Sequence, residues 1–321
     1  MRLDRLLAAT LVALAIAPLA AAQEKPPLKL VVGFPAGAAL DTLSRLIAEK
    51  MKATLARPVV VENKAGAGGM VAAEGLKATA PDGNTVLVSP VANISIAPHT
   101  YSSLRYNALT DFEAVAHLAD FQIAFGVNAD VPAQSLKDFV ALVKKDSQKY
   151  GNYASAGSGS LPHFFGILVA RTAGIEMTHV PYKGTAPAMQ ALAAGEISAA
   201  MLTLPDIGAV VKSGRARILA VSGARRSPFH PNVPTLKESG FNIEGNGWYA
   251  MYAPGKTPRA AIDAIAAAAV AAIKAPDVAE RLASMGLEVT GHGPAETARI
   301  TRADYEKWGP VIRASGFKAD Q

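Results

Sequence analysis

A serine and a histidine three positions apart are the residues in this chain that most resemble catalytic machinery. Ser160 and His163 could act as a nucleophile and its general base, as in a secreted α/β hydrolase. The surrounding sequence does not form the G-x-S-x-G turn of such enzymes, and it singles out no third residue to orient the imidazole. Hydrolysis by Ser160 and His163 therefore stays as the alternative to a binding function.

The glycine and hydroxyl residues around that pair favour an anion-binding loop. They follow a predicted strand and precede a predicted helix, in which Ser160 is expected to be the N-cap and Pro162 to lie in the first turn. Backbone N–H groups at the start of a helix attract negative charge. The predicted anion cradle consists of Ala156, Gly157, Ser158, Gly159 and Ser160, with His163 packed beside it.

A second helix start of the same kind follows the predicted strand 177–180. Thr185 is expected to be its N-cap, and the free N–H groups next to it suit an anion. Lys183 could supply a cation two residues earlier. Lysines in such turns usually face water, so we expect Lys183 to be exposed.

Asp41 is the most prominent carboxylate near the first predicted loop. It follows the turn Pro35-Ala36-Gly37 and is predicted to be the N-cap of a helix over residues 41–55. Its charge would repel a carboxylate placed directly beside it. We expect Asp41 to hold the loop in shape, or to meet the amino group of a ligand that has one.

The glycine loop 66–69 has the setting of a dinucleotide fingerprint, between a strand and a helix. Val71 stands where a glycine or alanine is needed for close helix packing, and no carboxylate follows about 20 residues on. We interpret the loop as a tight turn with positive φ, and we expect no nucleotide, metal or other cofactor.

Predicted strands and helices alternate from residue 28 to residue 222, which is typical of an α/β fold with largely parallel sheets. A last strand, 248–253, begins with Trp248 and Tyr249, which we expect to pack in the core or between lobes, and mainly helical sequence follows. Ligands of such sheets lie beyond the carboxyl ends of the strands. The other predicted strands are 28–34, 58–61, 85–89, 123–127, 153–156, 177–180, 198–203 and 218–222.

Length and composition exclude several classes of protein. A chain of 321 residues is long enough for two domains, and a break near residue 120 with an unlike ending after about 245 suggests that the middle section forms its own lobe. The absence of cysteine excludes disulfide-stapled and zinc-thiolate folds. The net charge of +6 is modest, and no basic stripe is interleaved with aromatics, so nucleic acid is not an expected partner.

The first segment reads as a secretory signal. Arg2 and Arg5 form a short basic head, an apolar run covers residues 6–19, and alanines occupy positions 20–22. The run is short and contains Pro18, which argues against a membrane anchor. We expect export to the periplasm with cleavage after Ala22, giving a soluble protein without a membrane anchor.

The motifs taken together resemble the exported substrate-binding receptors of tripartite tricarboxylate transporters, also called the Bug family. They occur in the family's order over nearly the whole mature chain. The matching segments are Gly33-Phe34-Pro35-Ala36-Gly37 with Asp41 and Arg45, residues 61–69, residues 153–160 with His163, residues 179–184, residues 219–222, residues 234–240 and residues 253–258.

The resemblance implies a two-lobed type II periplasmic-binding-protein fold, with a mostly parallel sheet in each lobe, that closes like a hinge on a small carboxylate. The expected lobes are residues 23–121 with 246–321 and residues 122–245, with hinge crossings near 120–124 and 243–248. The implied partners are a membrane permease or, alternatively, a sensor ectodomain, and a monomer is expected. The implied ligand-binding residues are Phe34, Pro35, Ala36, Gly37, Ala38, Asp41, Ser89, Asn93, Ala156 to Ser160, His163, Thr185 and Ala186.

Three residues depart from the family pattern. Ala38 replaces the second glycine of the first loop, Leu40 replaces a small or polar residue, and Ser198 replaces a carboxylate. The methyl group of Ala38 restricts close backbone approach, and Leu40 is expected to make the pocket mouth more apolar. These changes favour an aromatic or branched carboxylate over citrate or a simple dicarboxylate.

Overall fold

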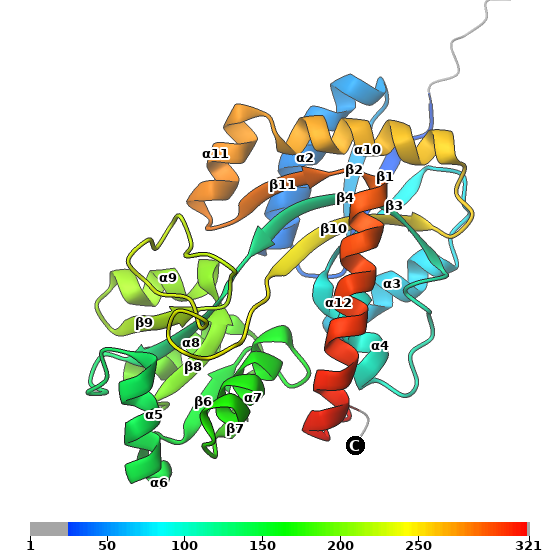
Figure 1. The fold of residues 1–321 in the computed structure, drawn as a ribbon. Helices are drawn as coiled ribbons and strands as arrows, with labels where there is room; N and C mark the ends of the chain where they lie inside the picture. Colours follow the sequence, from blue (N-terminus) through cyan, green and yellow to red (C-terminus); the bar gives the residue numbers. More distant parts are fainter. Residues whose placement is uncertain (1–24, 320–321) are drawn as a thin grey trace, which may run out of the picture.

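The chain forms two β-sheets with helices packed against them. The computed structural model describes residues 25–319, and Figure 1 shows one sheet with its helices above and the other at the lower left. We call the sheet that contains β1, with its helices, the first lobe, and the other sheet with its helices the second lobe. The predicted leader, residues 1–22, lies outside the described residues.

The six strands of the first sheet are ordered β11-β4-β10-β3-β1-β2. β1 runs parallel to β2 and β3, whereas β10 is antiparallel to β3 and β4, and β11 is antiparallel to β4. The strands are β1 (Leu28–Val32), β2 (Val59–Asn63), β3 (Thr85–Pro90), β4 (Phe112–Phe121), β10 (Gly247–Pro254) and β11 (Glu288–His292).

The five strands of the second sheet are ordered β7-β6-β8-β5-β9. β6 runs parallel to β7 and β8, and β5 is antiparallel to β8 and β9. The strands are β5 (Ile123–Asn128), β6 (Asn152–Ser155), β7 (Thr178–Pro181), β8 (Ala199–Thr203) and β9 (Ala216–Val221).

Helices connect the strands in both lobes. Along the first lobe they are α2 (Ala39–Leu55), the turn η1 (Ala67–Gly69), α3 (Met70–Lys77), η2 (Ala92–Ile96), α4 (Ala97–Thr100), α10 (Arg259–Ile273), α11 (Pro276–Ser284) and α12 (Pro294–Ser315). Along the second lobe they are α5 (Leu136–Lys145), α6 (Ser147–Tyr150), α7 (Leu161–Ala173), α8 (Thr185–Ala194) and α9 (Leu204–Lys212). Within residues 25–319, no helix is both long and apolar enough to cross a membrane.

The predicted α/β class with two sheets is confirmed, but both sheets are mixed and not largely parallel. The alternation of strands and helices did not predict β4 and β11, and β10 enters the first sheet between β3 and β4 from far along the chain. An antiparallel return of this kind needs no crossover helix, so the alternation of strands and helices does not reveal it.

Both tryptophans are buried in the core. Trp248 is 2% exposed, and its indole N–H donates to Asp304 Oδ2 at 2.6 Å, which satisfies its one polar atom. Trp308 on α12 meets Phe165 of α7 edge-on, with ring centroids 5.4 Å apart. The prediction that Trp248 packs in the core is therefore confirmed, and α12 links the two lobes.

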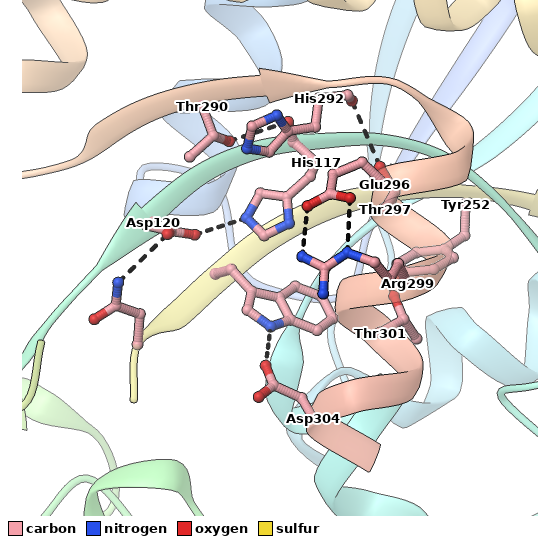
Figure 2. A network of polar contacts seen from close by, with 12 residues as sticks. His117, Asp120, Tyr252, Thr290, His292, Glu296, Thr297, Arg299, Thr301 and Asp304 are labelled. Atoms are coloured by element: carbon pink, nitrogen blue, oxygen red, sulfur yellow. Dashed lines mark hydrogen bonds and ion pairs between the residues drawn. The ribbon is translucent and has the colours of Figure 1, made fainter. Parts of the chain in front are cut away.

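A polar network lies where β4 leaves the first sheet (Figure 2). His117 Nε2 and Asp120 Oδ1 are 2.6 Å apart, and the amide of Asn246 donates to the other oxygen of Asp120 at 3.4 Å. Thr290 on β11 donates to the carbonyl of His117 at 3.2 Å. The network ties the ends of β4, β10 and β11 together next to the segments that pass to the second lobe.

Candidate ligand-binding site

A cavity of about 730 Å³ lies between the lobes and is lined by both of them. On one side are the loops after β1, β2 and β3 with the starts of α3 and α4, and on the other are the loops after β6 and β7 with the starts of α7 and α8. Its volume is that of a small-molecule site. The carboxyl ends of parallel strands thus meet at one cavity, as the α/β pattern predicts.

Most of the predicted binding residues line this cavity. From the first lobe they are Phe34, Pro35, Ala38 and Asn93, and from the second they are Ala156, Gly157, Ser158, Gly159, Ser160, Thr185 and Ala186. The structure therefore brings together residues up to 152 positions apart in the sequence, from Phe34 to Ala186.

The other predicted residues do not line the cavity. Asp41 and Ser89 are each 2% exposed and His163 is 6% exposed. Ala36 and Gly37 belong to the same loop as Pro35 without lining the cavity. Leu40 is 3% exposed in the core of the first lobe, so the expectation that it makes the pocket mouth more apolar was wrong.

Sequence reasoning missed about half of the lining. Lys183 is exposed, as expected, and it also lines the cavity. The glycine loop that was not expected to bind a nucleotide contributes Ala67, Gly68 and Met70. The position of that loop could have indicated these lining residues, because the loop follows a strand that ends at the same edge of the sheet as the other cavity loops. The remaining missed residues are Ala92, Ala97, Thr100, Tyr101, Gly184 and Pro187.

The glycine loop is shaped by close packing. A Cβ atom on Gly33 would come within 2.6 Å of Gly69 Cα, and Gly68 and Gly69 have φ values of 64° and 97°. Side chains at these positions would clash or be strained. The interpretation as a tight turn with positive φ is confirmed, and the turn carries the loop to the cavity wall.

Asp41 holds the first loop in shape, but it is not the N-cap. The N-cap of α2 is Ala38, and Asp41 in the first turn reaches back to accept the N–H of Gly37 at 2.8 Å. It also accepts from Asn63 Nδ2 at 2.9 Å and Arg45 Nε at 3.0 Å. Burial by itself would raise the pKa of the Asp41 carboxyl, but the bonds from Arg45, Gly37 and Asn63 hold this pKa below its ordinary value.

The cradle in the second lobe begins α7. Ser160 is the N-cap, as predicted, and its hydroxyl accepts from the N–H of His163 at 3.3 Å and donates to the carbonyl of Gly157 at 2.7 Å. His163 Nδ1 accepts the N–H of Gly159 at 3.1 Å. The serine hydroxyl and the imidazole thus both hold the loop, and neither bond is the serine-to-histidine bond of a catalytic pair.

A different serine and histidine do meet behind the cradle. Ser155 Oγ and His179 Nε2 are 2.7 Å apart, and Ser155 Oγ also donates to the carbonyl of Gly157 at 3.0 Å. Ser155 is fully buried, so a substrate carbonyl has no path to its hydroxyl. This pair fixes the loop as well.

The rings of His163 and His179 stack with centroids 3.9 Å apart. The ring of Phe317, beyond the end of α12, meets His163 edge-on at 5.0 Å. Burial, together with the neighbouring His179, lowers the pKa of His163 to about 4, and burial lowers the pKa of His179 to about 4. Both rings are therefore neutral at pH 7.

These two histidines predict that acid destabilises the protein. Their folded pKa values lie below the unfolded value of 6.5, so the unfolded chain binds more protons between pH 6.5 and 4. The contribution of the two rings to the free energy of unfolding should have its full value above pH 6.5. It should decrease towards pH 4, by up to about 1.4 kcal/mol per pH unit for each ring. Urea unfolding at several pH values measures the slope. His179→Gln should reduce it, and an unchanged slope in that variant would contradict the assignment.

No metal site accompanies the cavity in the part of the chain that the structure describes, since no group of three or more His, Asp or Glu residues there could hold an ion. The polar groups that the described lining residues supply are backbone N–H groups, hydroxyls and the ammonium group of Lys183, with helix starts in both lobes. Such groups bind and orient an anion.

Comparison with known proteins identifies the family. The family model described as the tripartite tricarboxylate transporter family receptor matches residues 43–317. The chain belongs to this receptor family. This confirms the predicted family, the predicted type of fold and the prediction that the chain is a periplasmic binding protein.

Relatives support the assignment over most of the chain. A protein of Pseudomonas sp. strain P51, named as a UPF0065 protein in the tcbD-tcbE intergenic region, is 32% identical over 302 residues, 92% of this chain and 88% of its own. The periplasmic binding protein BugD has 30% identity and a TM-score of 0.79, covering 92% of this chain and 99% of its own. The R. palustris protein Rpa4515 with adipate has 27% identity and a TM-score of 0.82, covering 92% and 98%.

Proposed function

We propose that this protein is an exported receptor that captures a small carboxylate between its two lobes and delivers it to the membrane permease of a tripartite transporter. The observation that supports this most strongly is the cavity, which is lined by the starts of α7 and α8 in one lobe and by three loops with the starts of α3 and α4 in the other. Receptors of this family act in transport, and the relative Rpa4515 holds adipate, a small carboxylate.

In this proposal the second lobe holds the carboxylate. Residues 156–160 and the start of α8 at Thr185 and Ala186 line the cavity, where the positive ends of two helices favour an anion. The N–H groups of Gly157 and Gly159 are used inside the loop, which fixes its shape. The first lobe encloses the rest of the ligand with Phe34, Pro35, Ala38 and Asn93. Asp41, Ser89 and His163 support these loops without lining the cavity.

Capture requires the lobes to move. We propose that lobe 1 comprises residues 23–121 and 246–321, that lobe 2 comprises residues 122–245, and that the crossings near 120–124 and 243–248 are the hinge. Closure is favoured because only the closed state contacts the ligand with both lobes. The leader is removed after Ala22 on export to the periplasm, and the closed receptor acts as a monomer. A sensor ectodomain is the alternative docking partner.

In this proposal Ser160 has no catalytic role, and the variant Ser160→Ala tests this. As an N-cap, Ser160 should contribute about 1 kcal/mol to the free energy of unfolding. Ser135, which caps α5 away from the cavity, is the matched control. Both alanine variants should lose similar stability by urea unfolding, only Ser160→Ala should weaken carboxylate binding several-fold, and neither should change background ester hydrolysis. Ester turnover that disappears in Ser160→Ala would support the hydrolase instead.

The receptor function is tested by thermal unfolding of residues 23–321 with a panel of aliphatic, aromatic and amino-acid carboxylates. A ligand at 100 times its Kd stabilises by about 2.7 kcal/mol, so the Tm of a chain of this length should rise by about 4 to 5 °C. We also expect to recover the carboxylate that raises the Tm chemically unchanged. A panel that leaves the Tm unchanged while an ester is consumed would overturn the proposal.

A further inference from the structure

The first half of α12 is fixed to the first lobe. Ser95 Oγ donates to the carbonyl of Thr301 at 3.1 Å, and His99 Nε2 lies 2.8 Å from the carbonyl of Tyr305. The rings of His99 and Tyr305 also lie against each other, with centroids 4.3 Å apart. The helix is therefore part of the first lobe, and its C-terminal end lies next to α7 of the second lobe (Figure 1).

The segment that follows α12, residues 316–319, contacts the second lobe. Phe317 is its one large apolar residue and is half-buried. The Phe317 ring meets the rings of His163 and Phe164 edge-on, with centroids 5.0 and 5.6 Å apart. A Cβ atom on Gly159 would lie 3.2 Å from this ring, so the ring covers that glycine of the cradle. An aromatic side chain attached to the first lobe thus packs on the anion-binding loop of the second.

The contact falls on a hydrogen bond that shapes the cradle. The N–H of Gly159 donates to His163 Nδ1 at 3.1 Å, and the ring of Phe317 lies against both residues. Gly159 has a φ of 73°, so few other residues could replace it at this turn. A hydrogen bond that is shielded from water is stronger than an exposed one. Phe317 is therefore placed to hold the cradle in shape while the lobes are in contact.

The same segment also contacts the first-lobe side of the cavity. Gly316 ends α12 with a φ of 72°, which turns the chain, and the N–H of Ala319 then donates to the carbonyl of Thr100 at 2.9 Å. Thr100 lines the cavity on the first lobe, and Gly159 lines it on the second. Residues 316–319 thus connect the two walls of the cavity at a point away from the predicted hinge crossings.

We propose that residues 316–319 form a latch that holds the lobes together over the ligand, and that Phe317 is a positioning residue for the cradle. The packing of Phe317 on the second lobe requires the lobes to meet, so it stabilises the closed state relative to the open one. A receptor whose closed state is less populated binds its ligand with a correspondingly larger Kd. The role in capture rests on the proposed function, whereas the latch can be tested without a ligand.

Phe317→Ala should raise the Kd for the best carboxylate of the panel about tenfold, mainly through faster dissociation, because the ligand leaves when the lobes open. Tyr150→Ala is the matched control. Tyr150 on α6 is also a half-buried aromatic residue, but it packs within the second lobe and does not line the cavity. Its Kd and dissociation rate should match those of the original protein. Stopped-flow fluorescence measures both quantities, and unchanged values in Phe317→Ala would overturn the latch.

Small-angle X-ray scattering of the ligand-free proteins tests the latch by itself. Phe317→Ala should have a larger radius of gyration than the original protein, and Tyr150→Ala should have the same radius as the original. Equal radii for all three proteins would overturn the latch and leave the receptor function standing. If no carboxylate of the panel binds, the proposed function fails, and the radius of Phe317→Ala still decides whether the segment holds the lobes together.

Discussion

Ser158→Asp is expected to weaken carboxylate binding about 100-fold. Ser158 is an exposed residue of the loop that precedes α7 and lines the cavity, so an aspartate there places its charge on the wall that we propose to hold the carboxylate. Two like charges about 6 Å apart at an effective dielectric constant of about 20 repel by about 2.8 kcal/mol, which is about 100-fold in Kd. Calorimetric titration with the best carboxylate of the panel measures the loss.

The neutral variant Ser158→Asn separates charge from shape. Asparagine has nearly the size of aspartate and keeps a polar side chain, so its Kd should stay within about fivefold of the original. The loss in Ser158→Asp should also shrink at high salt, since exposed charges are screened. Equal weakening by the two variants would show that the carboxylate lies away from this wall.

Asp41→Ala is expected to lower the free energy of unfolding by about 2 to 4 kcal/mol and to weaken binding at least tenfold. The carboxylate is 2% exposed and accepts hydrogen bonds from Gly37, Asn63 and Arg45. Its loss removes hydrogen bonds to a charged group, each worth about 1.5 to 3 kcal/mol, while the exposed donors of Gly37 and Arg45 regain water. Asn63 also donates to the carbonyl of Phe34 at 3.0 Å, so the cavity loop loosens with it. Urea unfolding and titration measure the two effects.

The effect of Asp41 has a pH dependence with a defined sign. Because its folded pKa lies below the ordinary value of 3.8, its contribution is present above that value and disappears as the pH falls through the folded pKa. The stability difference between the original protein and Asp41→Ala should therefore narrow below about pH 4. Glu49→Ala, on the exposed face of the same helix, is the control and should cost less than about 1 kcal/mol. A similar loss from both variants would contradict the role assigned to Asp41.

Local signals predicted the second-lobe wall well. The glycine and hydroxyl pattern of residues 156–160 predicted loop residues that line the cavity, and Ser160 is the N-cap as expected. The prediction that Thr185 is an N-cap was wrong, because Gly184 is the N-cap of α8 and Thr185 is its first helical residue. These features are encoded within a few neighbouring residues, where capping and turn preferences act.

The rest of the fold and of the site depends on pairing between segments that lie far apart in the sequence, which local patterns do not reveal. β4 and β11 join the first sheet through β10, which lies more than 120 residues after the start of β4 in the chain. Met70, Ala97 and Tyr101 line the cavity only because the loops after β2 and β3 meet at one sheet edge. The stack of His163 on His179 joins two different elements, α7 and β7, in the same way. No local pattern marks an apolar residue as cavity wall instead of core.

The central claim is that a carboxylate lies between the lobes and touches both. A crystal structure of residues 23–321 with the acid that gives the largest Tm shift tests it most directly. The account predicts carboxylate oxygens within hydrogen-bond distance of N–H or hydroxyl groups of residues 156–160 and Thr185, with the rest of the molecule against the wall that contains Phe34 and Ala38. An acid bound outside the cavity, or held by one lobe alone in a closed protein, would contradict it.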